Sequence, residues 1–158
     1  SSIPCYADAK TAERIRAYLT YIFDGRPAKS FRPGLELEEV DAHFEAAGEP
    51  IRPIPLLHGD LPIFGYRIRD FAYLTDVSAI PEDSYPLLEG LNVLVFAARR
   101  PEPHPPHFGL DQALAAAGRI GAQRTFLTHL SHRMAHDKVN KGLPSGVELA
   151  YDGLTIQT

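Results

Sequence analysis

The sequence predicts an α/β protein with a mixed sheet and flanking helices, and three observations favour this fold class. Short apolar runs of strand length end abruptly in polar residues, as in 54–58, 71–76 and 125–129. Segments with helical periodicity alternate with these runs. Residues 62–75 have the pattern of a hairpin, which indicates antiparallel pairing in part of the sheet.

Composition narrows the class of protein. At 158 residues the chain is predicted to form a single domain over 1–158, with enough length to bury a core. A net charge of -4 argues against a surface built for nonspecific nucleic-acid binding. Cys5 is the single cysteine, which excludes an internal disulfide and a cysteine zinc cluster. Without a bilayer-length apolar run or a signal peptide, we expect a cytoplasmic protein with no membrane partner.

The first third of the chain predicts strand, helix, loop and strand in turn. Residues 3–7 suit a strand, and Asp8 can cap a helix that runs to about Tyr21. Residues 25–34 carry two prolines and predict an exposed loop. Residues 35–40 alternate like a half-exposed strand, so their three glutamates are interpreted as a solvated face.

The middle of the chain predicts the sheet itself. Residues 51–57 contain two prolines and suit a strand near a sheet edge. The predicted hairpin turns at 69–70. Ser78 is a candidate N-cap for a short helix that ends near Glu89. Residues 91–97 form a continuous apolar run, which predicts a central strand covered on both faces.

The last third predicts irregular chain followed by alternating elements. Residues 99–107 hold four prolines and cannot be regular structure. The predicted elements that follow are a helix over 108–118, a strand over 125–128, a short helix over 135–141, a turn over 143–146 and a closing pair of strands around 151–153.

Four polar side chains follow the predicted strands or lie in the loops between them. They are His58, Asp76, His107 and His129. Neutral imidazole and carboxylate are ligands that zinc, manganese and iron accept. Any one of them alone is more simply interpreted as an ordinary polar residue, but four at strand ends favour a site.

An ordered set of motifs resembles a known family. The set consists of His58-Gly, Tyr73-Leu-Thr-Asp76, His107-Phe-Gly-Leu-Asp, Leu127-Thr-His129-Leu-Ser-His132 and the ending 143–153. This order resembles the metallo-β-lactamase-fold hydrolases, and within them the cyclic-phosphate phosphodiesterase branch, which is related to tRNA 3′-processing nucleases. The resemblance implies that the chain is the C-terminal part of a four-layer αββα sandwich.

The resemblance also implies a role for each motif residue. His58 matches a histidine of the first metal, Asp76 the carboxylate that bridges two metals, and His129 the last histidine, on the second metal. His107 matches the histidine that contacts the scissile phosphate and protonates the leaving oxygen. Two divalent metal ions, zinc or manganese, would polarise the phosphoryl group and activate a water, while an imidazolium would serve as general acid.

Other polar residues in these motifs have weaker claims. His132 either orients a metal ligand without touching the metal itself, or caps the next segment. Asp111 suits the first turn of a helix whatever the function. We expect His104, His136 and His43 to be exposed surface residues.

The family's His-x-His-x-Asp-His motif is absent from the chain. Two interpretations follow: the chain is part of a longer hydrolase, or it is a natural half-protein that lost catalysis. In either case we expect a missing N-terminal segment or a second chain to complete the site, because an incomplete ligand set leaves metal ions largely solvated and weakly held. A lone half would also expose an apolar sheet face, so we expect a homo-oligomer.

Three functions are therefore considered. The first is a metal-dependent phosphodiesterase that acts on a small phosphodiester. The second is a thioester or lactone hydrolase on the same fold, since metal-activated water serves either electrophile. The third is a noncatalytic binding or assembly module.

Overall fold

The computed structural model describes residues 2–25 and 32–157. The chain divides into two compact units, residues 1–44 and 45–158. The single domain over 1–158 stays a prediction. No helix within the described part of the chain is long and apolar enough to cross a membrane.

The first unit pairs two strands and carries two short helices. Strand β1 (Ile3–Ala7) runs parallel to β2 (Leu35–Glu39), and α1 (Ala9–Tyr18) and α2 (Thr20–Phe23) follow β1. The Asp8 carboxylate accepts a hydrogen bond from the Thr11 backbone N–H at 3.0 Å, which confirms the predicted N-cap. The three glutamates of 35–40 are exposed, as predicted. Most of the predicted 25–34 loop lies outside the described residues.

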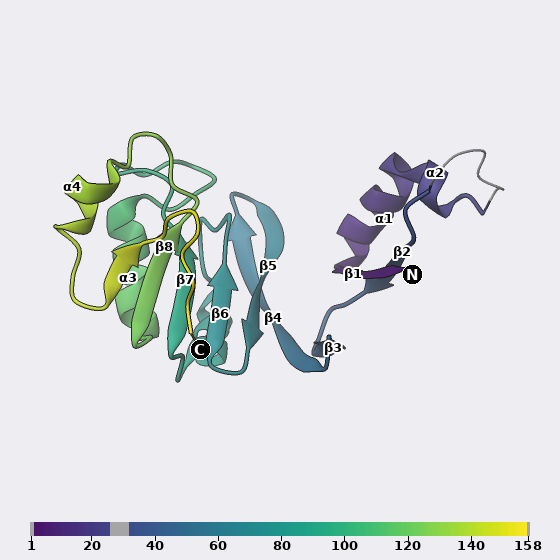
Figure 1. The fold of residues 1–158 in the computed structure, drawn as a ribbon, viewed down its shortest axis with the longest axis horizontal. Helices are drawn as coiled ribbons and strands as arrows, with labels where there is room; N and C mark the ends of the chain where they lie inside the picture. Colours follow the sequence, from purple (N-terminus) through teal and green to yellow (C-terminus); the bar gives the residue numbers. More distant parts are fainter. Residues whose placement is uncertain (1, 26–31, 158) are drawn as a thin grey trace. The chain divides into compact units, whose positions relative to one another are not determined.

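The second unit is built on a seven-stranded mixed sheet, which confirms the predicted fold class. Strands β4, β5 and β6 pair antiparallel, whereas β6, β7, β8 and β9 are parallel. Strands β4 to β8 lie side by side in Figure 1. In spatial order, which is also chain order, the strands are β3 (Phe44–Ala46), β4 (Glu49–His58), β5 (Leu61–Ile68), β6 (Phe71–Leu74), β7 (Val93–Ala97), β8 (Arg124–Thr128) and β9 (Val147–Leu149).

Helices cover one face of this sheet, and the core lies beneath them. The helical elements are η1 (Glu82–Leu88), α3 (Leu110–Ile120) and α4 (His136–Asn140). Helix α3 turns its buried alanines and Ile120 toward the core. All five residues of β7 are buried, which confirms the predicted central strand.

The opposite face of β7 and β8 is covered by the end of the chain itself. Val93, Val95 and Phe126 form a second buried cluster, against which Leu154 and Ile156 pack. A lone half is predicted to leave its apolar sheet face exposed. Over β7 and β8 that expectation is wrong, because the C-terminal segment supplies the apolar cover.

Two local predictions are also wrong. Ser78 does not cap a helix; its hydroxyl donates to the Leu57 carbonyl oxygen at 3.0 Å and accepts from the Gly59 N–H at 2.8 Å. The helix that follows is a 3₁₀ segment that begins at Glu82. The closing pair of strands is reduced to β9, because residues 151–157 pack on the sheet without joining it.

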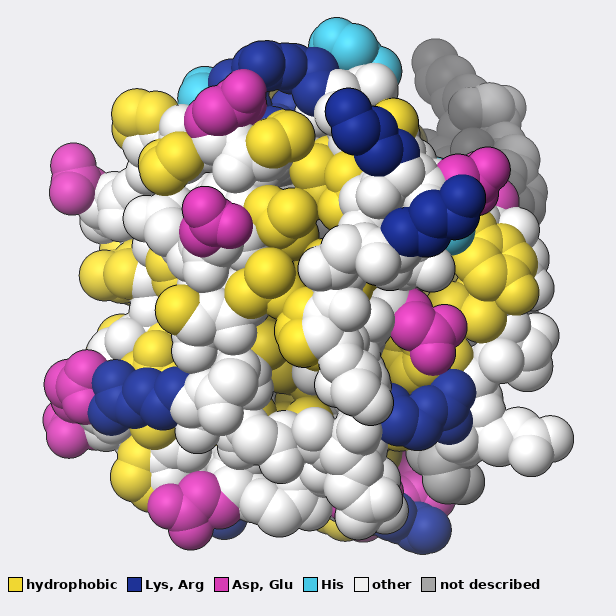
Figure 2. Space-filling view, turned by 90° about the vertical axis from the view of Figure 1, so that its left-hand side faces the viewer, with side chains coloured by type: hydrophobic (Ala, Val, Ile, Leu, Met, Phe, Trp, Pro, Cys, Tyr) yellow, Lys and Arg dark blue, Asp and Glu magenta, His cyan; other side chains and the backbone are white. Residues whose placement is uncertain are grey.

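Figure 2 shows the side of the molecule on which α3 and α4 lie in Figure 1. Hydrophobic side chains gather in the middle of this face, and charged side chains lie around them. A groove of about 430 Å³ runs between the two helices, with Leu110, Leu114, Val139 and Leu143 among its lining residues.

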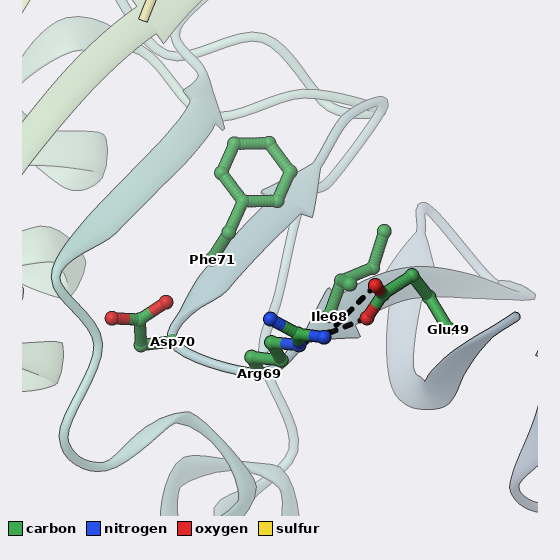
Figure 3. A pocket seen from close by; sticks show the side chains of 5 residues that line it. All are labelled: Glu49, Ile68, Arg69, Asp70 and Phe71. Carbon is green, nitrogen blue, oxygen red and sulfur yellow. Dashed lines mark hydrogen bonds and ion pairs between the residues drawn. The ribbon is translucent and has the colours of Figure 1, made fainter. Parts of the chain in front are cut away.

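A second pocket, of about 320 Å³, lies where β6 begins (Figure 3). Glu49 and Arg69 meet there in an ion pair of 2.9 Å between Oε2 and Nε. Arg69 occupies the hairpin turn with a φ of 54°. This pocket is at the N-terminal end of β6, so it lies at the other edge of the sheet from the predicted site.

Two glycines offer a matched test of the packing between β5 and β6. A Cβ at Gly65 would collide with the Leu74 side chain and lie 2.9 Å from Leu56 Cδ1 and 3.1 Å from the Tyr73 carbonyl oxygen. Gly65→Ala should therefore lower the free energy of unfolding by about 1–3 kcal/mol in urea titrations. Gly118 is exposed on α3 with nothing within 4 Å of a Cβ, so Gly118→Ala should raise it by about 0.5–1 kcal/mol. Equal effects of the two changes would contradict the packing described here.

Candidate functional site

The predicted site residues meet at one edge of the sheet because of strand direction. Strands β6, β7 and β8 are parallel, and β4 has the same direction because two antiparallel pairings separate it from β6. The C-terminal ends of these four strands therefore share an edge. His58 ends β4, Asp76 follows β6, His107 lies in the connection after β7, and His129 follows β8.

Backbone hydrogen bonds hold these four chain segments together. The Ser78 N–H donates to the Leu57 carbonyl oxygen at 2.7 Å, which ties the loop of Asp76 to the end of β4. The Phe108 N–H donates to the Val77 oxygen at 2.9 Å, and the Ser131 N–H donates to the Arg99 oxygen at 2.8 Å. Each site residue is thus one or two positions from a bond that crosses between loops.

The four side chains converge. Ligand atoms of His58, Asp76 and His107 all lie within 4.8 Å of one another. The His107 ring lies between two others, with centroids 4.6 Å from His58 and 4.8 Å from His129. His129 Nε2 is 3.3 Å from the Asp76 Oδ1 atom. The structure brings together all four residues that the sequence singled out.

His58 is oriented by a backbone carbonyl. Its Nδ1 lies 2.6 Å from the Pro106 oxygen, and a carbonyl can only accept, so Nδ1 carries the proton and donates. The lone pair is then on Nε2. A carbonyl on one ring nitrogen with the other nitrogen available as a ligand is the usual arrangement for metal-binding histidine.

His129 and Asp76 present two lone pairs to each other. Arg99 Nη1 lies 2.7 Å from His129 Nε2, and because a guanidinium has no acceptor, Nε2 must be the acceptor. The Asp76 oxygen 3.3 Å away is also an acceptor. Two acceptors this close repel each other unless a positive charge lies beside them, which is the condition that a metal ion or Arg99 meets.

Backbone strain coincides with the same two residues. Among the described residues, four non-glycine positions have positive φ, and Asp76 at 54° and His129 at 61° are two of them. Such conformations cost roughly 1–3 kcal/mol each and persist where the surroundings enforce them. Their coincidence at one point favours a functional reason for both.

The residues fit a divalent metal. His107 Nδ1 is buried without a hydrogen-bond partner, and a buried polar atom of this kind calls for a ligand. Together with His58 Nε2 and the Asp76 carboxylate, it gives a nitrogen and oxygen donor set that suits zinc or manganese. The lone pair of His129 Nε2 accepts from Arg99 in this structure, so His129 could join this set only if Arg99 moved away. His107 is as close to this set as the three predicted metal ligands are, so geometry alone does not separate its predicted catalytic role from a ligand role.

His107 is held neutral. Burial lowers the pKa of His107 to about 4, and electrostatic interactions with His129, His58 and Arg99 act in the same direction, while Asp76 partly offsets them. A neutral imidazole at pH 7 keeps its lone pair for a metal or a proton.

Some sequence expectations fail at this edge. His132 is exposed and none of the site contacts involves it, so its role as an orienting residue stays a prediction. His104 and His136 are half-buried instead of fully exposed: His104 Nδ1 is buried, and His136 Nε2 donates to the Leu149 oxygen at 3.2 Å. Arg99 was missed altogether. Its place two residues past the carboxyl end of the central strand is the signal that could identify it.

Comparison with known proteins agrees with this geometry. The family model described as a beta-lactamase superfamily domain matches residues 1–130. An octanoyltransferase of Porphyromonas gingivalis is 35% identical in an alignment of 153 residues that covers 94% of this chain and 31% of that protein. The chain thus spans about a third of the length of this curated relative.

Solved structures show the same fold. The crystal structure of a diphosphatase from the PhnP family has 37% sequence identity and a TM-score of 0.88, over 98% of this chain and 57% of that one. The short form of human tRNase Z has 18% identity and a TM-score of 0.67, over 99% of this chain and 68% of that one. The latter likeness is evidence for the fold alone.

The neutral state of His107 predicts a pH dependence of stability. Its pKa in the folded chain, about 4, is below the ordinary value of 6.5. As the pH falls below 6.5, His107 binds a proton in the unfolded chain but stays neutral in the folded chain. The contribution of His107 to the free energy of unfolding is therefore full above pH 6.5 and is lost as the pH falls toward 4. Urea midpoints measured with a chelator from pH 7.5 to 4.5 should fall more steeply for the wild type than for His107→Gln. Parallel pH profiles would show that His107 is not held neutral.

Proposed function

The chain belongs to the beta-lactamase superfamily, and from this premise we propose that it carries the catalytic edge of a metal-dependent hydrolase whose substrate is a small phosphodiester or a related phosphoric ester. The observation that carries the proposal is the convergence of His58, Asp76, His107 and His129 at the carboxyl ends of β4, β6, β7 and β8. The activity is that of the whole protein, of which this chain provides one part of the site.

In this proposal His58, Asp76 and His129 hold two divalent ions, zinc or manganese. Such ions polarise a phosphoryl group and lower the pKa of a water molecule. The chain's own contribution is to fix the ligands: the Pro106 oxygen sets the tautomer of His58. Arg99 donates to His129 Nε2 in this structure, so it would have to leave that nitrogen before His129 could hold an ion. The remaining ligands come from an N-terminal segment or from a second chain, and a homo-oligomer is one way to supply them.

His107 is the proposed general acid. Its ring lies between those of His58 and His129, where a phosphoryl group held by the ligands would touch it. A general acid must be protonated, whereas the pKa of His107 is lowered to about 4 by burial and neighbouring positive charge. An anionic phosphoryl group opposes that shift, so contact with substrate favours the imidazolium that can protonate the leaving oxygen.

The relatives support chemistry at phosphorus more than at an acyl carbon. The diphosphatase is 37% identical and covers nearly all of this chain. The octanoyltransferase name favours acyl chemistry, which keeps a thioester or lactone hydrolase as the second candidate, but the match covers only 31% of that protein. A binding module without catalysis is the third candidate, and metal content separates it from the other two.

Metal analysis tests the ligand assignment. Elemental analysis of the purified protein should detect divalent metal. The intact mass is determined on the same sample. Asp76→Asn removes a ligand charge and should weaken metal binding by more than roughly 100-fold, the upper range for loss of an outer-shell partner. Glu49→Gln, at the pocket on the opposite edge, is the matched control and should keep the metal. Absence of metal from a protein whose mass is well above 17.4 kDa would favour the binding module, whereas a metal-free protein of 17.4 kDa would have an incomplete site.

A substitution at His107 separates the two hydrolase candidates. His107→Ala should lower kcat for a phosphodiester by about 10²–10⁴, the range for loss of a general acid, with metal content unchanged. Turnover of a thioester should be reduced less, because a thiolate leaves without protonation. Loss of metal along with activity would show instead that His107 is a ligand, as its distance from His58 and Asp76 allows.

A further inference from the structure

We propose that Arg99 is a built-in cation of the site, which occupies the Nε2 atom of His129 and gives up this place when His129 binds a metal ion. The inference rests on the proposed function, because that function assigns His129 as a metal ligand. It makes Arg99 a positioning residue that holds His129 and Asp76 close together. Release of the Arg99 side chain is then part of the free energy of metal binding.

The Nε2 atom of His129 can bind only one partner at a time. Arg99 Nη1 lies 2.7 Å from it, and a guanidinium only donates, so the Nε2 lone pair accepts this hydrogen bond. A metal ion bound through Nε2 would use the same lone pair. The hydrogen bond from Arg99 and a bond to a metal ion therefore exclude each other.

The position of Asp76 explains why a cation is needed at this point. Its Oδ1 atom lies 3.3 Å from His129 Nε2, so two acceptors face each other across a short gap. Asp76 and His129 also have positive φ, which adds a backbone cost to the electrostatic cost of this approach. The positive charge of Arg99 beside Nε2 reduces the repulsion between the two acceptors, as a divalent ion would.

Only the side chain of Arg99 has to move for the exchange. The Arg99 N–H donates to the Phe108 oxygen at 3.2 Å, and the Arg99 oxygen accepts from the Ser131 N–H at 2.8 Å. These two bonds tie its backbone to the loops that hold His107 and His129. Within the part of the chain that the structure describes, no carboxylate forms an ion pair with Arg99. Rotation of the side chain away from His129 therefore breaks no ion pair there.

Arg100 offers a matched comparison. It follows Arg99 directly and carries the same charge, and its backbone is also fixed, because its oxygen accepts from the Leu110 N–H at 2.9 Å. Its Nε atom, however, is buried without a hydrogen-bond partner. A general effect of positive charge on metal binding should be shared by the two arginines, whereas competition for His129 Nε2 should be a property of Arg99 alone.

Zinc affinity tests the exchange without any turnover. Arg99→Met removes the donors and the charge and keeps an apolar stem of similar length. In calorimetric titrations, Arg99→Met should bind zinc about 10-fold more tightly than the wild type, because a hydrogen bond from a charged donor no longer competes for Nε2. Arg100→Met should have a much smaller effect. Zinc affinity that is unchanged or weaker in Arg99→Met, or equally tighter in both variants, would overturn the inference.

Stability in a chelator should change in the opposite direction. Without zinc, Arg99→Met leaves the Asp76 and His129 acceptors facing each other, so its thermal midpoint should be about 2–4 °C below that of the wild type. Saturating zinc should reduce or reverse this difference, because zinc binds the variant more tightly. Arg99→Lys keeps a charged donor, and its zinc affinity and midpoint should lie between those of Arg99→Met and the wild type. Equal midpoints for all three proteins in the chelator would contradict the positioning role.

The wild type alone provides a third measurement. In nitrogen-15 spectra, the side-chain signal of Arg99 should shift as zinc is added, because its guanidinium loses the hydrogen bond to His129. The side-chain signal of Arg100 is the internal reference and should move less. An Arg99 signal that stays unchanged at saturating zinc would show that the ion binds without displacing the guanidinium.

Measurements of zinc affinity and turnover together separate this inference from the proposed function. If the protein cleaves a phosphodiester and Arg99→Met does not bind zinc more tightly, the hydrolase stands and the exchange fails. If Arg99→Met binds zinc more tightly but the wild type cleaves no phosphorus ester, the exchange stands and the hydrolase fails. If neither protein binds zinc, both fail. Circular dichroism establishes that each variant is folded.

Discussion

The site depends on backbone hydrogen bonds that pass between loops rather than along strands. Strand pairing alone brings the ends of β4, β6, β7 and β8 to one edge, but it leaves each following loop free. The bonds from Ser78 to Leu57 and from Phe108 to Val77 remove that freedom, because each satisfies a backbone group that would otherwise be left unpaired in a crowded edge. The loops are therefore already ordered when the side chains meet. Binding of a substrate or metal does not have to offset the entropy cost of ordering them.

The strained backbone at Asp76 and His129 is maintained by the same framework. Each residue leaves a parallel strand and turns at once through a left-handed conformation. An aspartate tolerates this better than most residues, and a histidine is also among the types found there. The central strand β7 is completely buried. Burial of its apolar side chains on both faces stabilises the fold and offsets the free-energy cost of the two strained residues. Stability at the middle of the sheet and strain at its edge are therefore linked.

Much of the fold could be predicted because it depends on local pattern. The apolar run of β7, the hairpin around Arg69 and the cap at Asp8 each follow from neighbouring residues alone. What could not be predicted depends on distant partners. Ser78 has the spacing of a helix cap, yet its hydroxyl bonds to Leu57 on β4, 21 positions away. Likewise, nothing next to Arg99 in the chain reveals that it meets His129, 30 positions away. The residues of the site could be predicted from the ends of the strands, but the hydrogen bonds that hold them in place could not.

The hairpin formed by β4 and β5 has a consequence for how this chain can vary. Because two antiparallel pairings separate β4 from β6, His58 returns to the edge that the parallel strands share. An inserted or deleted strand would reverse that parity and send His58 to the opposite edge, however well the sheet itself tolerated the change. A turn at the far edge, such as the one at Arg69, could lengthen without altering which strand ends meet. The number of strands between β4 and β6 therefore decides whether His58 reaches the site, whereas the length of the turn at Arg69 does not.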